Sequence, residues 1–483
     1  MTMKRREFLK GAALTACAAS FAEVGRAAEP SPGRYSRRLD DRYAVDVCVA
    51  GAGPAGLAAA VMAARRGVKT LLLEAGTCFG GCGTQAGIPM FCMPTDGIHE
   101  TSAGFGSEVY RRIIDEGAAM PGTTQENKYK WGTLHFRCEA VKRVYDEIVT
   151  EAKVDFLFGV RAVDAETDTA GRVTRLVCAG KEGLFAVRAK VFVDATGDAD
   201  LTHFAGAESE YGDDEGNVQA STLPSVWAGI DWKTANVKGG GMWTHQSHLK
   251  QAFEDGVFRR YDPHLPGLFM SGETSAYGNA GHVWTNGTKD RSLSDAYVEG
   301  RRLLAEYERY YRRYIPGFEK AELVASGALM GVRESRRIVG DYRMTVGDYV
   351  ARRHFDDDIG SFSYPIDLHA AKPDAKLAKK ALADLESTKY KPGENYGIPY
   401  RALLPKGLAN VLVAGRCVSC DRAVQASLRV MPACFITGQA AGLAAALASS
   451  SYGGDVRTVP YAKLRAAIES VGGHVNFQKM SPS

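Results

Sequence analysis

Residues 45–76, VDVCVAGAGPAGLAAAVMAARRGVKTLLLEAG, restrict the possible folds more than any other stretch of the chain. A short valine-rich run over 44–50 predicts a buried strand, which stops at a glycine-rich loop. Residues 55–66 are strong helix formers ended by Gly67, and residues 68–73 predict a second strand. This order of strand, glycine loop, helix and strand predicts the first βαβ unit of a dinucleotide-binding fold.

The glycines of this loop stand where such a fold needs them. Gly51 permits the tight turn, Gly53 lets a pyrophosphate approach the backbone, and Gly56 lets the helix pack closely on the strand. Glu74 ends the second strand, where a carboxylate can accept hydrogen bonds from adenosine ribose hydroxyls. An acid at this position disfavours a 2′-phosphate, so we expect a dinucleotide other than NADP.

Three later segments extend the pattern. Gly80-Gly81 follows the acid, RAKVFVDATGDADL (188–201) predicts a buried strand that ends at a Thr-Gly-Asp turn, and LANVLVAGRC begins a third block at 408–448. In that block a strand stops at Gly415 and a helix of small residues follows. The first glycine loop does not distinguish FAD from NAD, so these segments must do so.

Together with GVRESRRIVGDY (331–342), YPIDLH (364–369) and YGIPYRALLPKGLANVLVAGRC (396–417), the chain from about 43 to 448 resembles the FAD-dependent oxidoreductase family of the glutathione-reductase-like flavoproteins. The resemblance implies FAD, with the C-terminal strand and loop reaching the isoalloxazine and ribityl chain. The predicted cofactor-binding residues are Gly51, Gly53, Pro54, Ala55, Gly56, Glu74, Gly81, Thr196, Gly197, Asp198, Gly415, Arg416 and Arg429.

The sequence contains no second G-x-G-x-x-G followed by an acid, and no closely spaced cysteine run suited to an iron–sulfur cluster. We therefore expect no separate NAD(P)H domain. The flavin then exchanges electrons directly with two partners in turn, a small organic substrate and a separate electron carrier.

The expected fold class is α/β, with a discontinuous Rossmann-like FAD-binding domain and an inserted α+β substrate domain. A helix over 294–315 is the clearest element of the insertion, and its four tyrosines at helical spacing predict core packing. The predicted boundaries are a signal peptide 1–28, a linker 29–42, FAD-binding parts 43–87, 138–207 and 396–450, a cap region 88–137, a substrate domain 208–395 and a C-terminal tail or helix 451–483.

The N-terminus has the layout of an export signal. A basic start, an apolar stretch and small residues around Ala27 are typical of a secretory peptide, and Arg5-Arg6 resembles the twin-arginine signal, which would make the export machinery a partner. Such export carries folded proteins, so we expect a periplasmic or secreted flavoprotein. A lipid anchor at Cys17 is not expected, because the apolar stretch after Lys10 is shorter than the ~7 residues such a segment needs.

Charge and hydropathy exclude two kinds of partner. Residues 1–28 carry three of the four surplus positive charges, so the remainder is nearly neutral and has no basic surface for nucleic acid. Beyond the signal, no stretch reads as the ~20 consecutive apolar residues of a membrane span.

Ten cysteines leave three alternatives open. Cys78 and Cys82 together with Cys417 and Cys420 have spacings that a four-thiolate zinc site permits, and the second pair permits a disulfide. A bond between Cys82 and the flavin is the third alternative. Small residues that fit flavin-domain loops explain the same positions, and we predict no metal.

A flavin dehydrogenase needs a base that takes a proton when hydride leaves the substrate. His369 is the predicted proton acceptor or donor and His282 the second candidate, because each ends or interrupts a strand-like run in the substrate domain. Arg336 and Arg401 are predicted to hold the substrate or to balance an anionic flavin, as members of a larger set that also contains Arg333, Arg337 and Arg429. Ion pairs with the carboxylates of Glu334, Asp341 and Asp367 are the alternative for each arginine.

These features predict an exported FAD-dependent oxidoreductase that moves electrons between a small organic substrate and a separate carrier, with oxidation of the substrate as the expected direction. The alternatives are a flavin-dependent reductase of a small organic acceptor and a FAD-bound module without turnover.

Overall fold

The computed structural model describes residues 38–120, 123–124, 126–127, 132–235, 248–260, 262, 267–372 and 374–475. The chain divides into two units, Met1–Asp40 and Asp41–Ser483. Only residues 38–40 of the first unit are described, so the predicted signal peptide, Cys17 and most of the linker lie outside the described residues. The last two linker positions, Asp41 and Arg42, already belong to the first strand.

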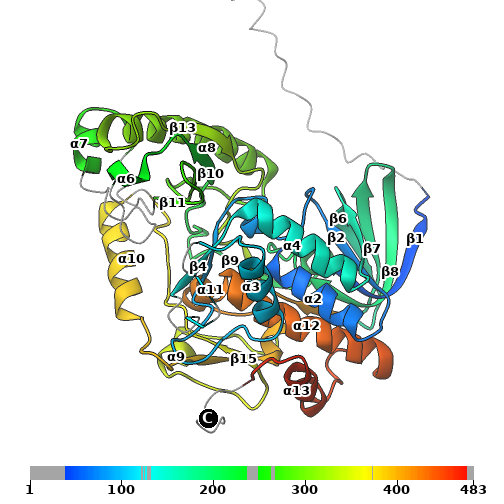
Figure 1. The fold of residues 1–483 in the computed structure, drawn as a ribbon. Helices are drawn as coiled ribbons and strands as arrows, with labels where there is room; N and C mark the ends of the chain where they lie inside the picture. Colours follow the sequence, from blue (N-terminus) through cyan, green and yellow to red (C-terminus); the bar gives the residue numbers. More distant parts are fainter. Residues whose placement is uncertain are drawn as a thin grey trace, which may run out of the picture. The chain divides into compact units, whose positions relative to one another are not determined.

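The second unit is built on a seven-stranded sheet in the order β5-β2-β1-β8-β7-β6, with β17 also paired to β8 (Figure 1). Strands β5, β2, β1, β8 and β17 are parallel, and β8, β7 and β6 form an antiparallel meander. The strands are β1 (Asp41–Ala50), β2 (Thr70–Glu74), β5 (Asp155–Phe158), β6 (Arg161–Thr167), β7 (Val173–Gly180), β8 (Gly183–Asp194) and β17 (Val411–Val413). This parallel sheet confirms the α/β fold class.

Both faces of the central strand β1 are covered at its carboxyl end, which explains the continuous apolar run over 47–50. Val47 and Val49 belong to the core beneath the helices, whereas Cys48 and Ala50 belong to a second core that includes residues of β7 and β8. The first core is made by α2 (Pro54–Arg65), α3 (Phe105–Asp115), α4 (Cys138–Glu151) and α12 (Met431–Ser451).

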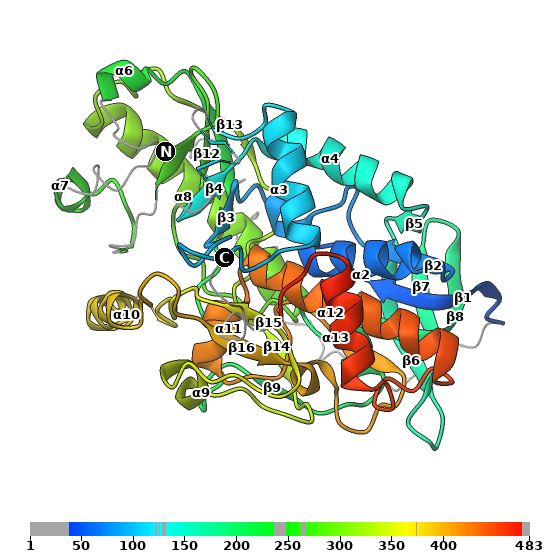
Figure 2. The ribbon, with the colours of Figure 1, turned by 60° about the horizontal axis from the view of Figure 1, so that its bottom comes forward.

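Helices α2 and α12 lie side by side against the sheet (Figures 1 and 2). Two glycines of α12 make this possible, because a Cβ atom on Gly438 or Gly442 would lie 2.1 Å from the carbonyl oxygen of Ala55 or Ala59. Among the described helices, α12 alone is long and apolar enough to cross a membrane, yet 94% of its most apolar 18-residue stretch is buried inside the fold. That burial fits a core helix.

A separate four-stranded antiparallel sheet, in the order β11-β12-β10-β13, lies within the predicted substrate domain. Helix α8 (Asp290–Tyr314) packs on it, and Tyr307, Tyr310 and Tyr311 are fully buried in the core between them. The prediction of a tyrosine-rich core helix is confirmed, although the helix begins four residues before Ser294. The strands are β10 (Ser225–Ala228), β11 (Leu268–Met270), β12 (Ala276–Gly278) and β13 (Glu322–Ser326).

Three further sheets have two strands each, β3–β4, β9–β14 and β15–β16. Residues of β3, α3 and β15–β16 enter the core beneath the helices, so the predicted cap region 88–137 packs directly on the predicted FAD-binding part. The remaining elements are η1 (Gly81–Gly83), β3 (Met90–Cys92), β4 (Thr133–His135), α5 (Asp200–Phe204), β9 (Ser209–Tyr211), α6 (Trp232–Ala235), α7 (Leu249–Glu254), β14 (Arg336–Ile338), α9 (Val346–Val350), β15 (Asp358–Phe362), α10 (Ala375–Ser387), β16 (Tyr396–Pro399), η5 (Tyr400–Leu403), α11 (Arg422–Leu428) and α13 (Tyr461–Ser470).

Candidate active site

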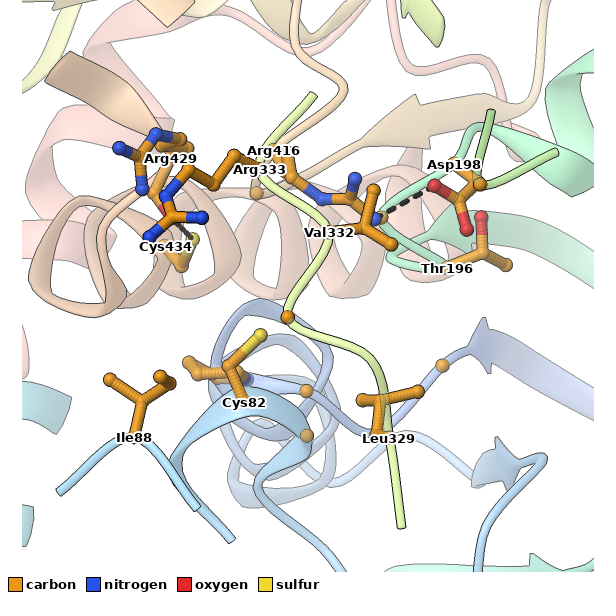
Figure 3. A pocket seen from close by; sticks show the side chains of 18 of the residues that line it. Cys82, Ile88, Thr196, Asp198, Leu329, Val332, Arg333, Arg416, Arg429 and Cys434 are labelled. Carbon is orange, nitrogen blue, oxygen red and sulfur yellow. Dashed lines mark hydrogen bonds and ion pairs between the residues drawn. The ribbon is translucent and has the colours of Figure 1, made fainter. Parts of the chain in front are cut away.

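A long cleft of about 1880 Å³ runs along the carboxyl ends of the parallel strands. Segments far apart in sequence line it, among them the glycine loop, the turn at 196–198, the loop after β17 and the segment 329–333 (Figure 3). Ligands of open α/β sheets bind at this edge. Of the predicted cofactor residues, those that line the cleft are Gly51, Gly53, Pro54, Ala55, Glu74, Gly81, Thr196, Gly197, Asp198, Gly415, Arg416 and Arg429.

The three loop glycines have different surroundings. Gly51 has φ +93°, and a Cβ there would lie 2.5 Å from the carbonyl oxygen of Ala195. Gly56 does not line the cleft and serves helix packing, since a Cβ there would lie 1.8 Å from the oxygen of Gly51. Gly53 has an ordinary φ of −66° and nothing within 4 Å of its Cβ position. Neither backbone conformation nor protein packing requires a glycine at 53, whereas a ligand against the backbone does.

Two helices begin at the cleft without a side-chain cap. Gly53 is the N-cap of α2 and Val430 that of α12, and neither first turn contains an acidic residue. Unpaired N–H groups and the positive end of the helix dipole favour negative charge at both places.

Glu74 already supports the glycine loop. Its carboxylate accepts hydrogen bonds from the backbone N–H groups of Ala52 (2.8 Å) and Gly76 (2.6 Å), and from the amide of Gln85 (3.1 Å). The residue also lines the cleft, as a ribose-binding acid must. Since a carboxylate offers about four acceptor positions, both roles are compatible.

Asp198 and Arg416 come from different predicted parts of the domain and form an ion pair of 2.8 Å (Figure 3). Gly197, with φ +79°, leaves room for the Arg416 guanidinium, which would lie 2.9 Å from a Cβ there. The pair therefore joins the turn after β8 to the loop after β17 along the cleft wall.

Arg336 and Arg401, predicted to hold the substrate or to balance an anionic flavin, each have a carboxylate partner. Arg336 lines the cleft, but its Nη1 donates to Asp198 O (2.8 Å) and to Asp200 Oδ1 (2.9 Å), so it supports the turn after β8. Arg401 does not line the cleft and forms a bidentate pair with Asp357 at 2.9 and 3.0 Å. Sequence spacing could not show that both guanidiniums already have carboxylate partners.

The two predicted histidines, by contrast, are in direct contact. Nε2 of His282 lies 2.9 Å from Nδ1 of His369, and Nδ1 of His282 lies 3.2 Å from a carboxylate oxygen of Asp262. Nε2 of His369 lies 3.5 Å from Asp367 Oδ1. Both imidazoles line the cleft, so a chain Asp262–His282–His369–Asp367 runs along its wall.

Asp367 is the charged centre of this group. Arg429 donates to its carboxylate at 2.9 Å, and the Tyr364 hydroxyl donates at 3.2 Å. Burial alone would raise the pKa of Asp367, but His369 and the guanidiniums of Arg429 and Arg333 hold it well below its ordinary value. Asp367 is therefore an anion that can stabilise a protonated His369.

Sequence reasoning missed Asp262 and treated Asp367 only as an ion-pair partner. The motif YPIDLH places Asp367 two residues before His369, which is a usable signal. Asp262 lies in a segment without periodicity or motif, and its contact with His282 depends entirely on tertiary structure.

The described cysteines are all free, and no group of three or more metal-ligating residues occurs in the described part of the chain. Burial raises the pKa of Cys82, which lines the cleft, and raises those of Cys420 and Cys434 to about 12. These surroundings disfavour the thiolate that zinc binding or attack on a flavin requires.

The model of the family described as FAD dependent oxidoreductase matches residues 46–468. No curated protein matches the chain.

Similar solved structures include a geranylgeranyl bacteriochlorophyll reductase-like protein from Thermoplasma acidophilum, with 13% identity, coverage of 89% of this chain and 84% of that one, and a TM-score of 0.43. The myxobacterial chondrochloren halogenase has 12% identity, coverage of 89% and 78%, and a TM-score of 0.44. The p-nitrophenol 4-monooxygenase of Pseudomonas putida has 16% identity, coverage of 62% and 70%, and a TM-score of 0.40.

Proposed function

Because the chain belongs to the FAD-dependent oxidoreductase family, whose model matches residues 46–468, we propose that it is an exported dehydrogenase of a small organic substrate. Its cofactor is FAD, and the open space at Gly53 with two uncapped helix N-termini fits that anionic group. When bound, FAD supplies a two-electron acceptor for hydride. A finer placement among glutathione-reductase-like flavoproteins rests on the motif order of the sequence.

The observation that carries this proposal is the histidine chain in the cleft wall. An ionised Asp262 can only accept, so Nδ1 of His282 donates to it and Nε2 of His282 accepts. Nε2 of His282 then takes the hydrogen bond from Nδ1 of His369, which places the basic lone pair of His369 on its Nε2. Asp367 also only accepts and lies 3.5 Å from that Nε2, so the three contacts of the chain need three N–H donors, one more than two neutral imidazoles carry. The histidine pair therefore takes up a further proton readily at Nε2 of His369, which makes His369 a base.

His369 is the proposed catalytic residue, and His282 and Asp262 are positioning residues. As the substrate loses a hydride and a proton, Nε2 of His369 takes the proton. Asp367, 3.5 Å away and ionised, stabilises the resulting imidazolium. The electrons leave afterwards to a separate carrier, for which the sequence provides no binding domain of its own.

Export of the folded holoprotein belongs to the same proposal. The twin-arginine pattern at Arg5-Arg6 supports it, and a periplasmic flavoprotein without a nicotinamide domain suits a respiratory or other small electron carrier.

The test is a screen of small organic compounds for bleaching of the oxidised flavin, followed by reoxidation with quinones and dyes. In the variant His369→Gln, we expect flavin reduction ~10²–10⁴-fold slower with FAD still bound. The double variant with His282→Gln should be no slower than His369→Gln alone, because His282 acts through His369.

A different rate pattern would contradict the assignment. If the two single effects multiply in the double variant, the histidines act independently. If His369→Gln reduces its flavin at the wild-type rate, another group is the base. A flavin that exchanges electrons with no compound would favour a module without turnover.

A further inference from the structure

Arg333 differs from the other arginines of the cleft wall. The residue is 7% exposed and lines the cleft, and its Nη1 donates to Ala220 O (2.7 Å) and Thr222 Oγ1 (2.9 Å). Both acceptors are neutral. In the described part of the chain, no carboxylate lies within 4.0 Å of this guanidinium.

The neighbouring arginines all have such partners. Arg336 pairs with Asp200, Arg416 with Asp198 and Arg429 with Asp367, each at 2.8–2.9 Å. Asp367 and Asp262 attract the Arg333 guanidinium only from beyond 4.0 Å, so it has no direct charged partner. A buried charge of this kind is costly, so proteins keep one only where something else compensates it. Burial and the nearby Arg429 lower the pKa of Arg333 to about 10, which still leaves it cationic at neutral pH.

Arg429 provides a second, independent sign of a ligand. Its Nη2 is held by Asp367, but its Nε is buried and has no hydrogen-bond partner in the described part of the chain. Figure 3 shows Arg333 and Arg429 together at one end of the cleft, beside Cys434 and across from Cys82 and Ile88. Two guanidiniums therefore lie at the same end of the cleft.

The other anionic groups expected in the cleft have their own sites. The pyrophosphate belongs at Gly53 and the start of α2, and the uncapped start of α12 offers N–H groups for negative charge on the flavin. Arg333 belongs instead to the part of the wall built by the predicted substrate domain, since Ala220 and Thr222 hold it.

A hydrogen-bonded path connects Arg333 to the proposed base. The side chain of Gln425 donates to Arg333 O (2.8 Å), and the Gln219 amide donates to that of Gln425 (2.9 Å). The oxygen of Gln219 accepts from the backbone N–H of His369 (3.2 Å). Gln219 and Gln425 are both buried, so the backbones of Arg333 and His369, from which the guanidinium and the imidazole extend, are tied to each other.

We propose that the substrate is an organic carboxylate, whose carboxylate group binds Arg333 with a contribution from Nε of Arg429, while its reacting carbon stands beside His369. This assignment rests on the proposed dehydrogenase function and names its substrate class. It replaces Arg336 and Arg401 as the substrate-holding arginines.

The test is equilibrium binding to the oxidised holoprotein, which needs no turnover. Benzoate, succinate and lactate, with benzamide and succinamide as neutral analogues, are titrated while the flavin absorption spectrum and the heat of binding are followed. We expect at least one carboxylate to bind ~100-fold more tightly than its amide, because the amide loses a charged hydrogen-bonded pair in a desolvated site. Arg333→Gln should lose this preference with FAD still bound, and Arg333→Lys should restore part of it.

Arg343→Gln is the matched control, since Arg343 pairs with Glu210 at 2.7 Å outside the cleft and should leave carboxylate affinity unchanged. The proposal is wrong if no carboxylate binds more tightly than its amide, or if Arg333→Gln binds carboxylates as the wild type does. A lowered flavin midpoint potential in Arg333→Gln with unchanged carboxylate affinity would assign the cation to the flavin instead. None of these results affects the dehydrogenase assignment, which stands or falls on flavin bleaching and on His369.

Discussion

Gly51 and Gly53 are two residues apart, yet a side chain would have opposite consequences at the two positions. At Gly53 a valine Cβ meets no protein atom within 4 Å and keeps an ordinary φ of −66°. At Gly51 even an alanine needs φ +93° and lies 2.5 Å from Ala195 O. Of these two glycines, only Gly53 leaves open space beside the backbone that a ligand can fill.

We therefore expect Gly53→Val to fold but to bind FAD at least ~100-fold more weakly, because the side chain occupies the place of the pyrophosphate. Gly51→Ala should instead destabilise the fold itself. Thermal denaturation of the apoproteins and release of FAD on filtration separate the two effects. Equal loss of apoprotein stability in both variants would contradict this reading of the loop.

Asp358 makes stability depend on pH. The residue is 1% exposed, and its carboxylate contacts Nδ1 of His354 at 2.8 Å. Burial raises the pKa of Asp358 to about 6, against the effect of His354. A raised acid pKa means that folding favours the protonated form, so its contribution is present at low pH and is lost as the pH rises through about 6.

The stability of Asp358→Asn relative to the wild type should therefore rise by about 1 kcal/mol between about pH 5 and about pH 7.5. Urea denaturation of both proteins at the two pH values measures this difference. A difference that is independent of pH, or that falls as the pH rises, would show that Asp358 does not carry the effect.

Helices α2 and α12 meet without space for a methyl group at two points, Gly438 and Gly442. Gly438→Ala should push α12 away from α2 and destabilise the protein by about 1–3 kcal/mol, as overpacking of a well-packed core does. Because both helices begin at the cleft, FAD affinity should fall as well. Ser450→Ala, at an exposed position near the end of α12, is the matched control and should change neither quantity appreciably.

Chemical denaturation and FAD titration of Gly438→Ala measure both effects. If the stability is unchanged, the backbones of α2 and α12 are farther apart than the distances of 2.1 Å from the Cβ positions of Gly438 and Gly442 imply.

The elements best predicted from sequence are those in which local pattern and burial agree. The pattern places the strand, loop, helix and strand of 44–74 within three residues of their bounds, because both faces of the strands are buried and the glycines mark the turns. It marks the buried end of strand β8, 191–194, whereas the earlier residues of the strand alternate between buried and exposed, as suits the antiparallel meander that they form with β7 and β6. Helix α8 begins at Asp290, where Ser292 receives the Asn286 N–H and closes the preceding turn.

The site is predictable to the extent that motifs mark it. Nearly all the cofactor residues line the cleft, and both histidines do as well. What could not be predicted is pairing across long sequence separations. His282 and His369 are 87 residues apart, and their contact makes them one chain of proton donors and acceptors in place of two rival bases. In the same way, the carboxylate partners of the two arginines are distant in sequence. Asp357 lies 44 residues from Arg401, and Asp200 lies farther still from Arg336.

The proposed export depends on the whole chain, because the predicted signal and the folded unit must act together. The first unit ends at Asp40 and β1 begins at Asp41, so the predicted signal lies outside the unit that carries the cleft. Replacing Arg5-Arg6 by Lys-Lys should leave FAD-containing protein in the cytoplasm, because a receptor for paired guanidiniums is not satisfied by two ammonium groups. Cell fractionation with flavin fluorescence measures the outcome. Unchanged periplasmic yield would indicate another kind of signal.

The cleft walls come from residues near 51, 196, 333 and 416, in the order in which a ribosome releases them. The βαβ unit emerges first, but the loop after β17 and the start of α12 emerge only after some 430 residues have been made. Until then the cleft lacks Arg416, Arg429 and one of its two helix N-termini. Cofactor capture therefore follows the synthesis of β17 and the start of α12, and a chain interrupted before residue 411 lacks both, so it cannot form the flavin site.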